Sequence, residues 1–320
     1  MTASGAARLG EDSHLRPTRT LWQDARRRLL KNRLSVMGLF ILTLFLVAAT
    51  LGPYIAPYDF LAQDINQRLQ GPSFNHWLGT DALGRDIFSR LLYGARTAAL
   101  VAAVTIVISL TVGIALGTIA GFLGGRVDSF IMWLTDVTMS IPGLLLAMLV
   151  NAALLYPVQN WFDQRYDETR NSLYLNTAWL DYVLVFSTLG LIAWPGFARL
   201  IRGQVLSIEQ MIYIEAARSI GTTSSGIMRR HIVPNALGPV VVAVTQGMGA
   251  AIVLESSLSF IGIGVQPPNA SWGSMLADSL ALWTTEPHLM IAPAATIGII
   301  SVAFIFVGDG LNDALDPRQQ

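Results

Sequence analysis

Few side chains in this 320-residue sequence are placed for acid–base, metal or nucleophilic chemistry. Cysteine is absent, which excludes disulfides, zinc–thiolate sites and iron–sulfur clusters. His76, His231 and His288 fall in three separate regions of the chain, so we predict no metal site. The sequence contains no Gly-x-x-x-x-Gly-Lys-Ser/Thr loop of the kind that holds nucleotide phosphates. We therefore predict no catalytic residue and no cofactor bound by this chain.

Asp136 and Glu255 are the two acidic residues that the sequence places within or near strongly apolar segments. An acidic residue inside the bilayer costs roughly 2.5–3.5 kcal/mol on insertion scales, so it is a functional candidate by default. The alternative is that Asp136 lies one turn from the cytoplasmic face and Glu255 near the outer face, with both reaching water. The apolar segments hold no opposite charge and no chain of His, Asp and Glu, which argues against proton-driven transport.

Charge is scarce along the whole chain. Only 13% of the residues are charged and 52% are hydrophobic, whereas about a quarter of the residues in a soluble domain carry charge. A water-soluble globule of this size could not be covered with so few charges, so much of the surface must face lipid. The net charge is zero, which argues against a nucleic-acid-binding protein.

Six apolar segments are long enough to cross a bilayer, which takes about 20 residues of α-helix. They cover residues 34–58, 97–125, 137–162, 182–198, 232–254 and 287–308. The third is expected to begin earlier, near Ser129, and so to include Asp136. None alternates as a barrel strand does, and in lipid the backbone must satisfy its own hydrogen bonds. The sequence therefore predicts an all-α integral membrane protein with six transmembrane helices.

A cleaved signal peptide is the alternative interpretation of the first segment. Signal peptides have short charged starts and apolar regions of about 7–15 residues, whereas a polar segment more than 30 residues long precedes a longer apolar run here. We therefore predict a retained helix.

Lys and Arg concentrate in the cytoplasmic segments of membrane proteins. With the N-terminus inside, the inside segments hold 15 of them and the outside segments six, four of which lie in the first outside loop. Both termini are therefore predicted to be cytoplasmic.

We divide the chain into a cytoplasmic N-terminal segment (1–33), a first transmembrane helix with an external loop (34–95), and a core of five helices (96–316). In the first region, Thr20–Arg33 is expected to form a helix in the headgroup layer, with Trp22 and leucines on one face and basic residues on the other. A solvated basic tail is the alternative.

Three glycines in the second apolar segment recur at intervals of four residues: Gly113, Gly117 and Gly121. This spacing puts them on one helix face, where a neighbouring backbone can approach closely. The alternative is that small residues are simply common in membrane helices. We favour a packing face.

The polar stretch between the fourth and fifth segments, within residues 199–235, is the most informative part of the sequence. Tyr213–Ile220 is rich in good helix formers, and Gly221 is a natural helix stop. Pro234 then fixes the entry to the fifth segment. By itself this pattern predicts a short helix held between two membrane helices, either as a plain connector or as a contact for a soluble partner.

The same stretch resembles the signature loop of ABC-importer permeases. The matching residues are Glu215, Ala216 and Ala217, then Gly221 four residues later, then Pro234 thirteen residues after the glycine. The general pattern has Ile and Leu before the proline, where this chain has His231 and Val233.

That departure resembles the dipeptide, oligopeptide and nickel branch of these permeases, which reads Arg-His-Ile-x-Pro-Asn. The matching residues are Arg230, His231, Ile232, Pro234 and Asn235. Three other stretches are similar to the same branch: Leu78–Arg90 with Tyr93–Arg96, Ser140–Pro142 and Leu254–Gly262.

The resemblance implies a permease of the type I ABC importer fold in a bacterial or archaeal cytoplasmic membrane. It further implies a second homologous permease subunit, two cytoplasmic ATPase subunits that bind ATP and Mg²⁺, and an external solute-binding protein. The residues around Glu215–Gly221 would then contact an ATPase. Peptides are the expected substrates, and nickel complexes or glutathione-like peptides are alternatives. An ion-coupled carrier or channel acting alone is a further alternative, and a membrane-embedded enzyme is remote.

Two outer regions remain open at this stage. Near Arg85 the external loop is expected to become a helix in which Asp86 and Arg90 pair four residues apart, worth about 0.2–0.5 kcal/mol if exposed. This helix would either brace the bundle laterally or meet the binding protein. The loop Tyr156–Asp181, which carries Trp161 and several acids, is another candidate docking surface or a solvated cap.

Overall fold

The computed structural model describes residues 26–315, apart from 172–173, 175–177 and 266–267. In this part of the chain the elements are helices without a strand, and one isolated β-bridge joins Thr80 and Asp86. Six of the helices are long and apolar enough to cross a membrane. They are α2 (Arg33–Ile55), α3 (Ile87–Leu123), α5 (Gly143–Thr169), α6 (Ala178–Glu209), α9 (Val233–Phe260) and α11 (His288–Leu315). The predicted fold class, an all-α membrane protein with six transmembrane helices, is confirmed.

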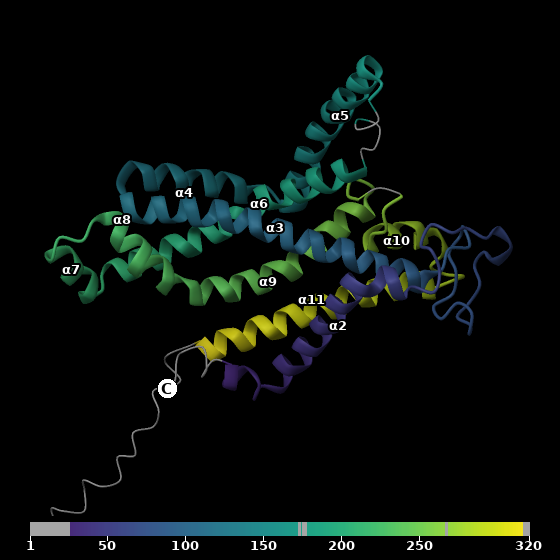
Figure 1. Ribbon diagram of the computed structural model, residues 1–320, viewed down its shortest axis with the longest axis horizontal. Coiled ribbons are helices and arrows are strands. Elements are labelled where there is room, and N and C mark those ends of the chain that lie inside the picture. The colour runs from purple at the N-terminus through teal and green to yellow at the C-terminus, as the bar shows by residue number, and fades with distance from the viewer. Residues whose placement is uncertain (1–25, 172–173, 175–177, 266–267, 316–320) are drawn as a thin grey trace, which may run out of the picture.

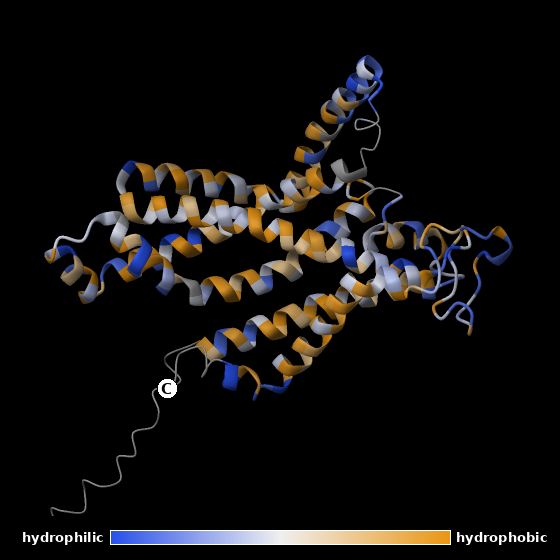
Figure 2. Cartoon of the chain, viewed as in Figure 1, coloured by the Kyte–Doolittle hydropathy of each residue, from blue (hydrophilic) through white to orange (hydrophobic). Residues whose placement is uncertain are grey.

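Apolar residues recur along the whole length of these helices, as the orange segments of the ribbon in Figure 2 show. Phe40 on α2, Val107 on α3 and Ile291 on α11 are each more than 60% exposed. A monomer in water rarely exposes so many large apolar side chains. Lipid or other apolar protein surfaces therefore cover the bundle.

The long helices give the molecule two distinct ends (Figure 1). At the first, which we name the loop end, lie the start of α2, the end of α11 and the connection from α6 to α9. That connection contains α7 (Ile212–Ser219), α8 (Ser224–Ile227) and the π-helical turn η3 (Met228–Ile232). At the second, the cap end, lie residues 56–86 with η1 (Ile65–Gln67), and α10 (Trp272–Ser279) with η4 (Leu280–Leu282).

The third crossing is broken into two helices, which corrects the expected single helix from Ser129. After α3, Gly124 and Gly125 take positive φ angles of 62° and 55°, and α4 (Gly125–Ser140) runs back along the bundle. α4 ends before Pro142, because proline pushes the preceding residue out of the helical region. Ile141 accordingly has φ −93° and ψ 129°. Asp136 thus belongs to α4, while α5 diverges from the bundle (Figure 1).

Three other expected boundaries are also wrong, for a common reason. α3 begins at Ile87 and not near residue 97, α6 continues to Glu209 and not only to Ala198, and α5 continues to Thr169 through the expected outer loop. The apolar segments end at the first charged or polar residues, but a helix continues through charged residues that have partners, as Arg90 and Arg199 do, or that are exposed, as Arg96 is. The helix near Arg85 is therefore not a separate lateral brace. It is the start of α3, which also runs uninterrupted through the predicted boundary at residue 96.

The N-terminal helix predicted for Thr20–Arg33 lies partly outside the described residues. Residues 26–29 are helical, but residues 30–32 form a break. Asn32 caps α2, because its Oδ1 accepts hydrogen bonds from the backbone N–H groups of Leu34 (3.0 Å) and Ser35 (3.3 Å). An uninterrupted helix to Arg33 is therefore wrong.

The three spaced glycines lie on the face of α3 that packs against α6, the most extensive helix pair in the described chain. A Cβ atom added to Gly113 would lie 2.5 Å from the Cβ of Phe197. One added to Gly117 would lie 2.5 Å from the carbonyl oxygen of Ala198, and one added to Gly121 would lie 2.8 Å from the Cβ of Val205. The two backbones can be this close only where α3 has no side chain.

We predict that Gly117→Leu destabilises the α3–α6 pair. The new side chain would meet backbone atoms of α6 that cannot move aside, and overpacking costs about 1–3 kcal/mol or more. Thermal unfolding of the detergent-purified protein measures this loss, and assembly with copurifying subunits should fall with it. Gly298→Leu on α11 is the control, since a Cβ there would meet no atom within 4 Å. Equal melting of the two variants would mean that α6 does not cover this face.

Candidate functional site

The α6–α9 connection is built around a short helix fixed to the bundle by its apolar side. Ile214 and Ala217 of α7 belong to one buried apolar cluster with Ile201 and Val205 of α6 and Ile232 of η3. α7 is therefore packed against the bundle, so a displacement of α7 would be passed to α6 and α9.

Gly221 ends α7 as the sequence predicts. Its φ of 81° is in the left-handed region that glycine adopts without steric cost. The N–H of Gly221 donates to the carbonyl of Arg218 (2.9 Å), and that of Thr222 donates to the carbonyl of Ala217 (3.0 Å). These two bonds form a Schellman motif, which satisfies the last carbonyls of the helix and reverses the chain.

The opposite face of α7 exposes large apolar side chains at the loop end. Ile212 and Ile220 are 84% and 83% exposed, and Met211 and Tyr213 are also exposed. Among them stands Glu215, whose carboxylate has no hydrogen bond or ion pair with any residue that the structure describes. An exposed apolar patch around a charged residue is typical of a surface that meets another protein.

Arg218 supplies a fixed charge at the base of this surface. It forms an ion pair with Glu209, the last residue of α6, and so ties the two helices together. Both residues are partly exposed, so the pair contributes little to stability. Its effect is to orient α7 on α6.

The remaining signature residues lie where the connection enters α9. Arg230 and His231 belong to η3, and Pro234 and Asn235 to the first turn of α9. Pro234 has no N–H to donate, and the chain accommodates it with a π-helical turn in which Val233 N–H bonds the carbonyl of Met228. The Asn235 side chain donates to the carbonyl of His231 (2.5 Å).

The structure thus brings the two halves of the signature together. The rings of Tyr213 on α7 and His231 on η3 lie 6.1 Å apart between centroids. Glu215, Ala216 and the exposed isoleucines face away from the bundle, whereas Ala217 faces it. The apolar contribution of Met211, Ile212 and Ile220 was missed in the sequence. The signal was present in the sequence, in the spacing of these three residues around the helix relative to Ile214 and Ala217.

Asp136 has an ion-pair partner in the bundle. It forms an ion pair with Arg199 of α6, and Asp128 of α4 holds Arg202 of α6 through two hydrogen bonds, Nη2 to Oδ2 at 2.6 Å among them. Bidentate pairs of this kind are well oriented. The sequence placed both arginines in a loop, so these two links between α4 and α6 were not foreseen.

Glu255 is 1% exposed, so the alternative that it reaches water is wrong. Its carboxylate accepts hydrogen bonds from the hydroxyls of Ser259 (2.6 Å), Ser271 (2.8 Å) and Ser256 (3.4 Å). Ser271 in turn caps α10, accepting from the N–H of Gly273 at 3.2 Å. Glu255 therefore connects the end of α9 to the start of α10.

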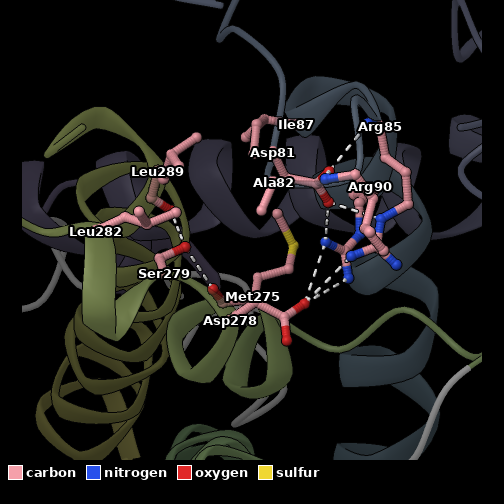
Figure 3. Close-up of a pocket in the computed structure, with 11 residues that line it drawn as sticks. Asp81, Ala82, Arg85, Ile87, Arg90, Met275, Asp278, Ser279, Leu282 and Leu289 are labelled. Atoms are coloured by element: carbon pink, nitrogen blue, oxygen red, sulfur yellow. Dashed lines mark hydrogen bonds and ion pairs between the residues drawn. The ribbon is translucent and has the colours of Figure 1, made fainter. Parts of the chain in front are cut away.

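A second cluster of charges ties α10 to α3 at the cap end, around a cavity of about 160 Å³ (Figure 3). The carboxylate of Asp81 lies 2.7 Å from Arg85 Nε and 2.7 Å from Arg90 Nη1. Asp278 of α10 lies 3.3 Å from Arg85 and 3.5 Å from Arg90. Arg90 and Asp81 are almost fully buried, and Asp278 is half exposed. Two acids here neutralise two bases.

The predicted pairing of Asp86 with Arg90 is therefore wrong. Asp86 caps α3 by accepting from the N–H of Ser89 (2.7 Å), and its other oxygen lies 2.9 Å from Nδ1 of His76. His76 also lies 2.8 Å from Gln67 and stacks on Tyr58. Both carboxylate oxygens of Asp86 are thus engaged, and Arg90 pairs with Asp81 and Asp278 instead.

Comparison with known proteins defines the class of this membrane protein. Residues 113–320 match the family described as binding-protein-dependent transport system inner membrane component. Residues 20–72 match the N-terminal transmembrane domain of oligopeptide transport permease C. The chain belongs to the first of these families, and it is a multi-pass permease component of an ABC importer and not itself a catalyst.

Three relatives match almost the full chain. The dipeptide transport system permease protein DppC of Bacillus subtilis is 37% identical over 308 residues, covering 96% of this chain and 89% of the relative. The oligopeptide transport system permease protein OppC of the same organism is 34% identical over 299 residues, with 93% and 90% covered. The glutathione transport system permease protein GsiD of Pectobacterium atrosepticum is 36% identical over 302 residues, with 94% and 92% covered.

We predict that Asp81→Leu destabilises the cap end, because it leaves the buried guanidinium of Arg90 without its nearest partner. Breaking one side of a buried pair costs about 3–5 kcal/mol, whereas replacing both partners is far better tolerated. The double variant Asp81→Leu/Arg90→Leu should therefore melt above the single variant in detergent. Asp163→Leu, at an exposed acid of α5, serves as control. A double variant that melts at the sum of the two single losses would contradict this coupling.

Proposed function

We propose that this chain is one permease subunit of an ATP-driven importer that carries peptides across the cytoplasmic membrane by alternating access. The observation that carries the proposal is the exposed apolar face of α7 on a helix whose other face is buried in the bundle. Such a helix can receive a displacement from a soluble partner and pass it to α6 and α9. ATP can drive the bundle only if the ATPase dimer binds one of its conformations more tightly than the other.

Four kinds of partner follow from this proposal. Two ATPase subunits bind ATP and Mg²⁺ in the cytoplasm, and one of them receives Glu215–Gly221. A second homologous permease completes the pathway; the low burial of α5, which leaves the bundle, supports a partner there. An external solute-binding protein delivers the substrate, and residues 56–86 with the outer part of α5 are its candidate contacts. Membrane lipid covers the rest, and no nucleic acid takes part.

The loop end would face the cytoplasm, with both chain termini on that side. The excess of Lys and Arg in the segments at this end supports the orientation. The first outer loop seemed to oppose it because of its four arginines. Two of them, Arg85 and Arg90, are neutralised by Asp81 and Asp278, so this loop presents less free positive charge than the sequence suggests.

Peptides are the proposed substrates because the three relatives carry dipeptide, oligopeptide and glutathione names. Nickel complexes and glutathione-like peptides are the alternatives for the same machinery. A carrier that acts alone makes a different prediction, since the isolated chain would then take up solute without ATP. Uptake by vesicles that contain this chain only would refute the importer.

We predict that Ile212→Asp lowers ATP-driven peptide uptake by reconstituted vesicles about tenfold or more. A charge on the exposed apolar face of α7 weakens a central contact, and such contacts are worth about 2 kcal/mol or more. Membrane insertion should be unchanged, because Ile212 is 84% exposed and outside the spanning helices. Ile212→Leu is the matched control, because it keeps an apolar side chain at the same exposed position. Equal uptake by both variants would remove α7 from the ATPase contact.

We also predict that Glu215→Arg and Gly221→Asp each separate ATP hydrolysis from transport. The first reverses the free charge on the exposed face of α7. The second forces a side chain into a positive φ angle and loosens the Schellman turn that holds the helix end. Hydrolysis and uptake are measured together on the reconstituted complex. Wild-type uptake with both variants would contradict the role assigned to the loop.

A further inference from the structure

A long apolar groove opens on the surface of the bundle between α2, α3, α9 and α11. Its volume is about 660 Å³. Its walls are apolar over most of their length, with Leu46 of α2, Leu100 and Ala103 of α3, and Met248 of α9 among the lining residues. Leu46 and Leu100 are about half exposed in it. The α6–α9 connection and the ion-pair cluster of the cap end do not line this groove.

The groove has a positive charge toward the cap end. Arg96 of α3 lines it together with Tyr54 and Thr50 of α2. Arg96 is exposed, and its guanidinium forms no hydrogen bond or ion pair with the part of the chain that the structure describes. The Tyr54 side chain is 85% exposed. An arginine within a membrane-spanning helix needs an anion or water near its head group.

The contacts between α2 and α3 give the depth of Arg96. A Cβ on Gly52 would lie 3.0 Å from the carbonyl oxygen of Leu92, and the Tyr93 hydroxyl donates to the carbonyl of Pro53 at 3.4 Å. The last turn of α2 is therefore level with Leu92 and Tyr93. Arg96 lies about one turn, roughly 5–6 Å, deeper. α2 has 23 residues, close to the roughly 20 that span the hydrocarbon, so Arg96 reaches the headgroup level at this end.

The two threonine hydroxyls of the groove already donate their protons within the chain. The Thr50 hydroxyl donates to the carbonyl of Leu46 (2.7 Å), and the Thr245 hydroxyl donates to the carbonyl of Val241 (2.9 Å). A peptide lying here would bury its N–H and C=O groups without partners, which costs several kcal/mol for each unsatisfied group. An acyl chain needs no such partners. One cationic end and a long apolar wall match a lipid and not an extended peptide.

We propose that this groove binds a phospholipid from the leaflet at the cap end. The lipid phosphate lies against the guanidinium of Arg96, with the Tyr54 hydroxyl beside it, and one acyl chain runs along Leu46, Leu100 and Ala103. A guanidinium recognises a phosphate through charge-assisted hydrogen bonds. An anionic headgroup is preferred over a zwitterionic one, because the choline of the latter would offset the attraction.

The test uses the intact complex purified with its copurifying subunits. Native mass spectrometry counts bound lipid after titration with phosphatidylglycerol or with phosphatidylcholine of the same acyl chains. The wild-type complex should retain phosphatidylglycerol preferentially. Arg96→Gln should weaken its binding about tenfold, the effect of losing a hydrogen bond to a charged group. Arg96→Lys should keep part of it.

Two further variants separate the parts of the site. Ala103→Trp fills the groove while it leaves Arg96 in place, and it should also reduce lipid binding. Arg68→Gln removes an exposed arginine of the cap end outside the groove and should change nothing.

Unchanged phosphatidylglycerol binding in Arg96→Gln would overturn the proposal. A second result would also overturn it: Arg96→Gln binds lipid normally and still takes up amidated peptides, but no longer takes up peptides with a free C-terminal carboxylate. Arg96 would then contact the substrate. Loss of the second permease subunit from Arg96→Gln, with lipid binding unchanged, would assign the arginine to an acid of that subunit. Because bound lipid is counted directly, the experiment tests the lipid site even if the importer proposal is wrong.

Discussion

The close approach of α3 and α6 is the constraint on which the other features of the bundle depend. Gly113, Gly117 and Gly121 let the backbone of α6 lie against α3, and the Ser109 hydroxyl donates across the contact to the carbonyl of Gly190 at 2.9 Å. In lipid no hydrophobic effect drives helices together, so close packing and interhelical hydrogen bonds must do so. The pair connects both ends of the molecule, because α6 leads into α7 at the loop end and α3 begins beside the charge cluster at the cap end. A change in this contact would therefore alter both ends.

Charges in the long helices are arranged so that nearly every one that leaves water has a partner. Arg199 and Arg202 are held by Asp136 and Asp128, which attaches α4 to α6 where the third crossing is otherwise broken at Pro142. At the other end Arg90 is held by Asp81. These pairs contribute direction more than stability, since desolvation offsets much of their attraction. They fix which helix faces meet. Arg96 differs because its guanidinium has no such partner in the described chain, and this difference points to a ligand from outside.

The two ends of the bundle handle exposed polar and apolar groups in opposite ways. At the cap end, Glu255 gathers three serine hydroxyls and thereby holds the start of α10, so polar groups are buried and satisfied. At the loop end, Ile212 and Ile220 are left uncovered on a helix that is otherwise fixed. A rigid helix with an uncovered apolar face is suited to transmit a displacement, whereas a flexible one would absorb it. The proposed contact with an ATPase depends on this combination of an anchored inner face and a free outer face.

The sequence by itself determined the all-α membrane class, the number of spanning helices, the short helix of the loop and its stop at Gly221. These features follow from local physics: apolar length, backbone hydrogen bonding in lipid, and the conformational freedom of glycine. Only the tertiary structure decided where α3 and α6 begin and end, because Arg90, Arg199 and Arg202 interrupt the apolar pattern and become tolerable only when acids distant in the sequence meet them. It also decided that Glu255 is buried and that Asp86 caps a helix and does not pair with Arg90. Pairing between residues far apart in the chain leaves no periodic trace in a single sequence, and so it had to be seen in three dimensions.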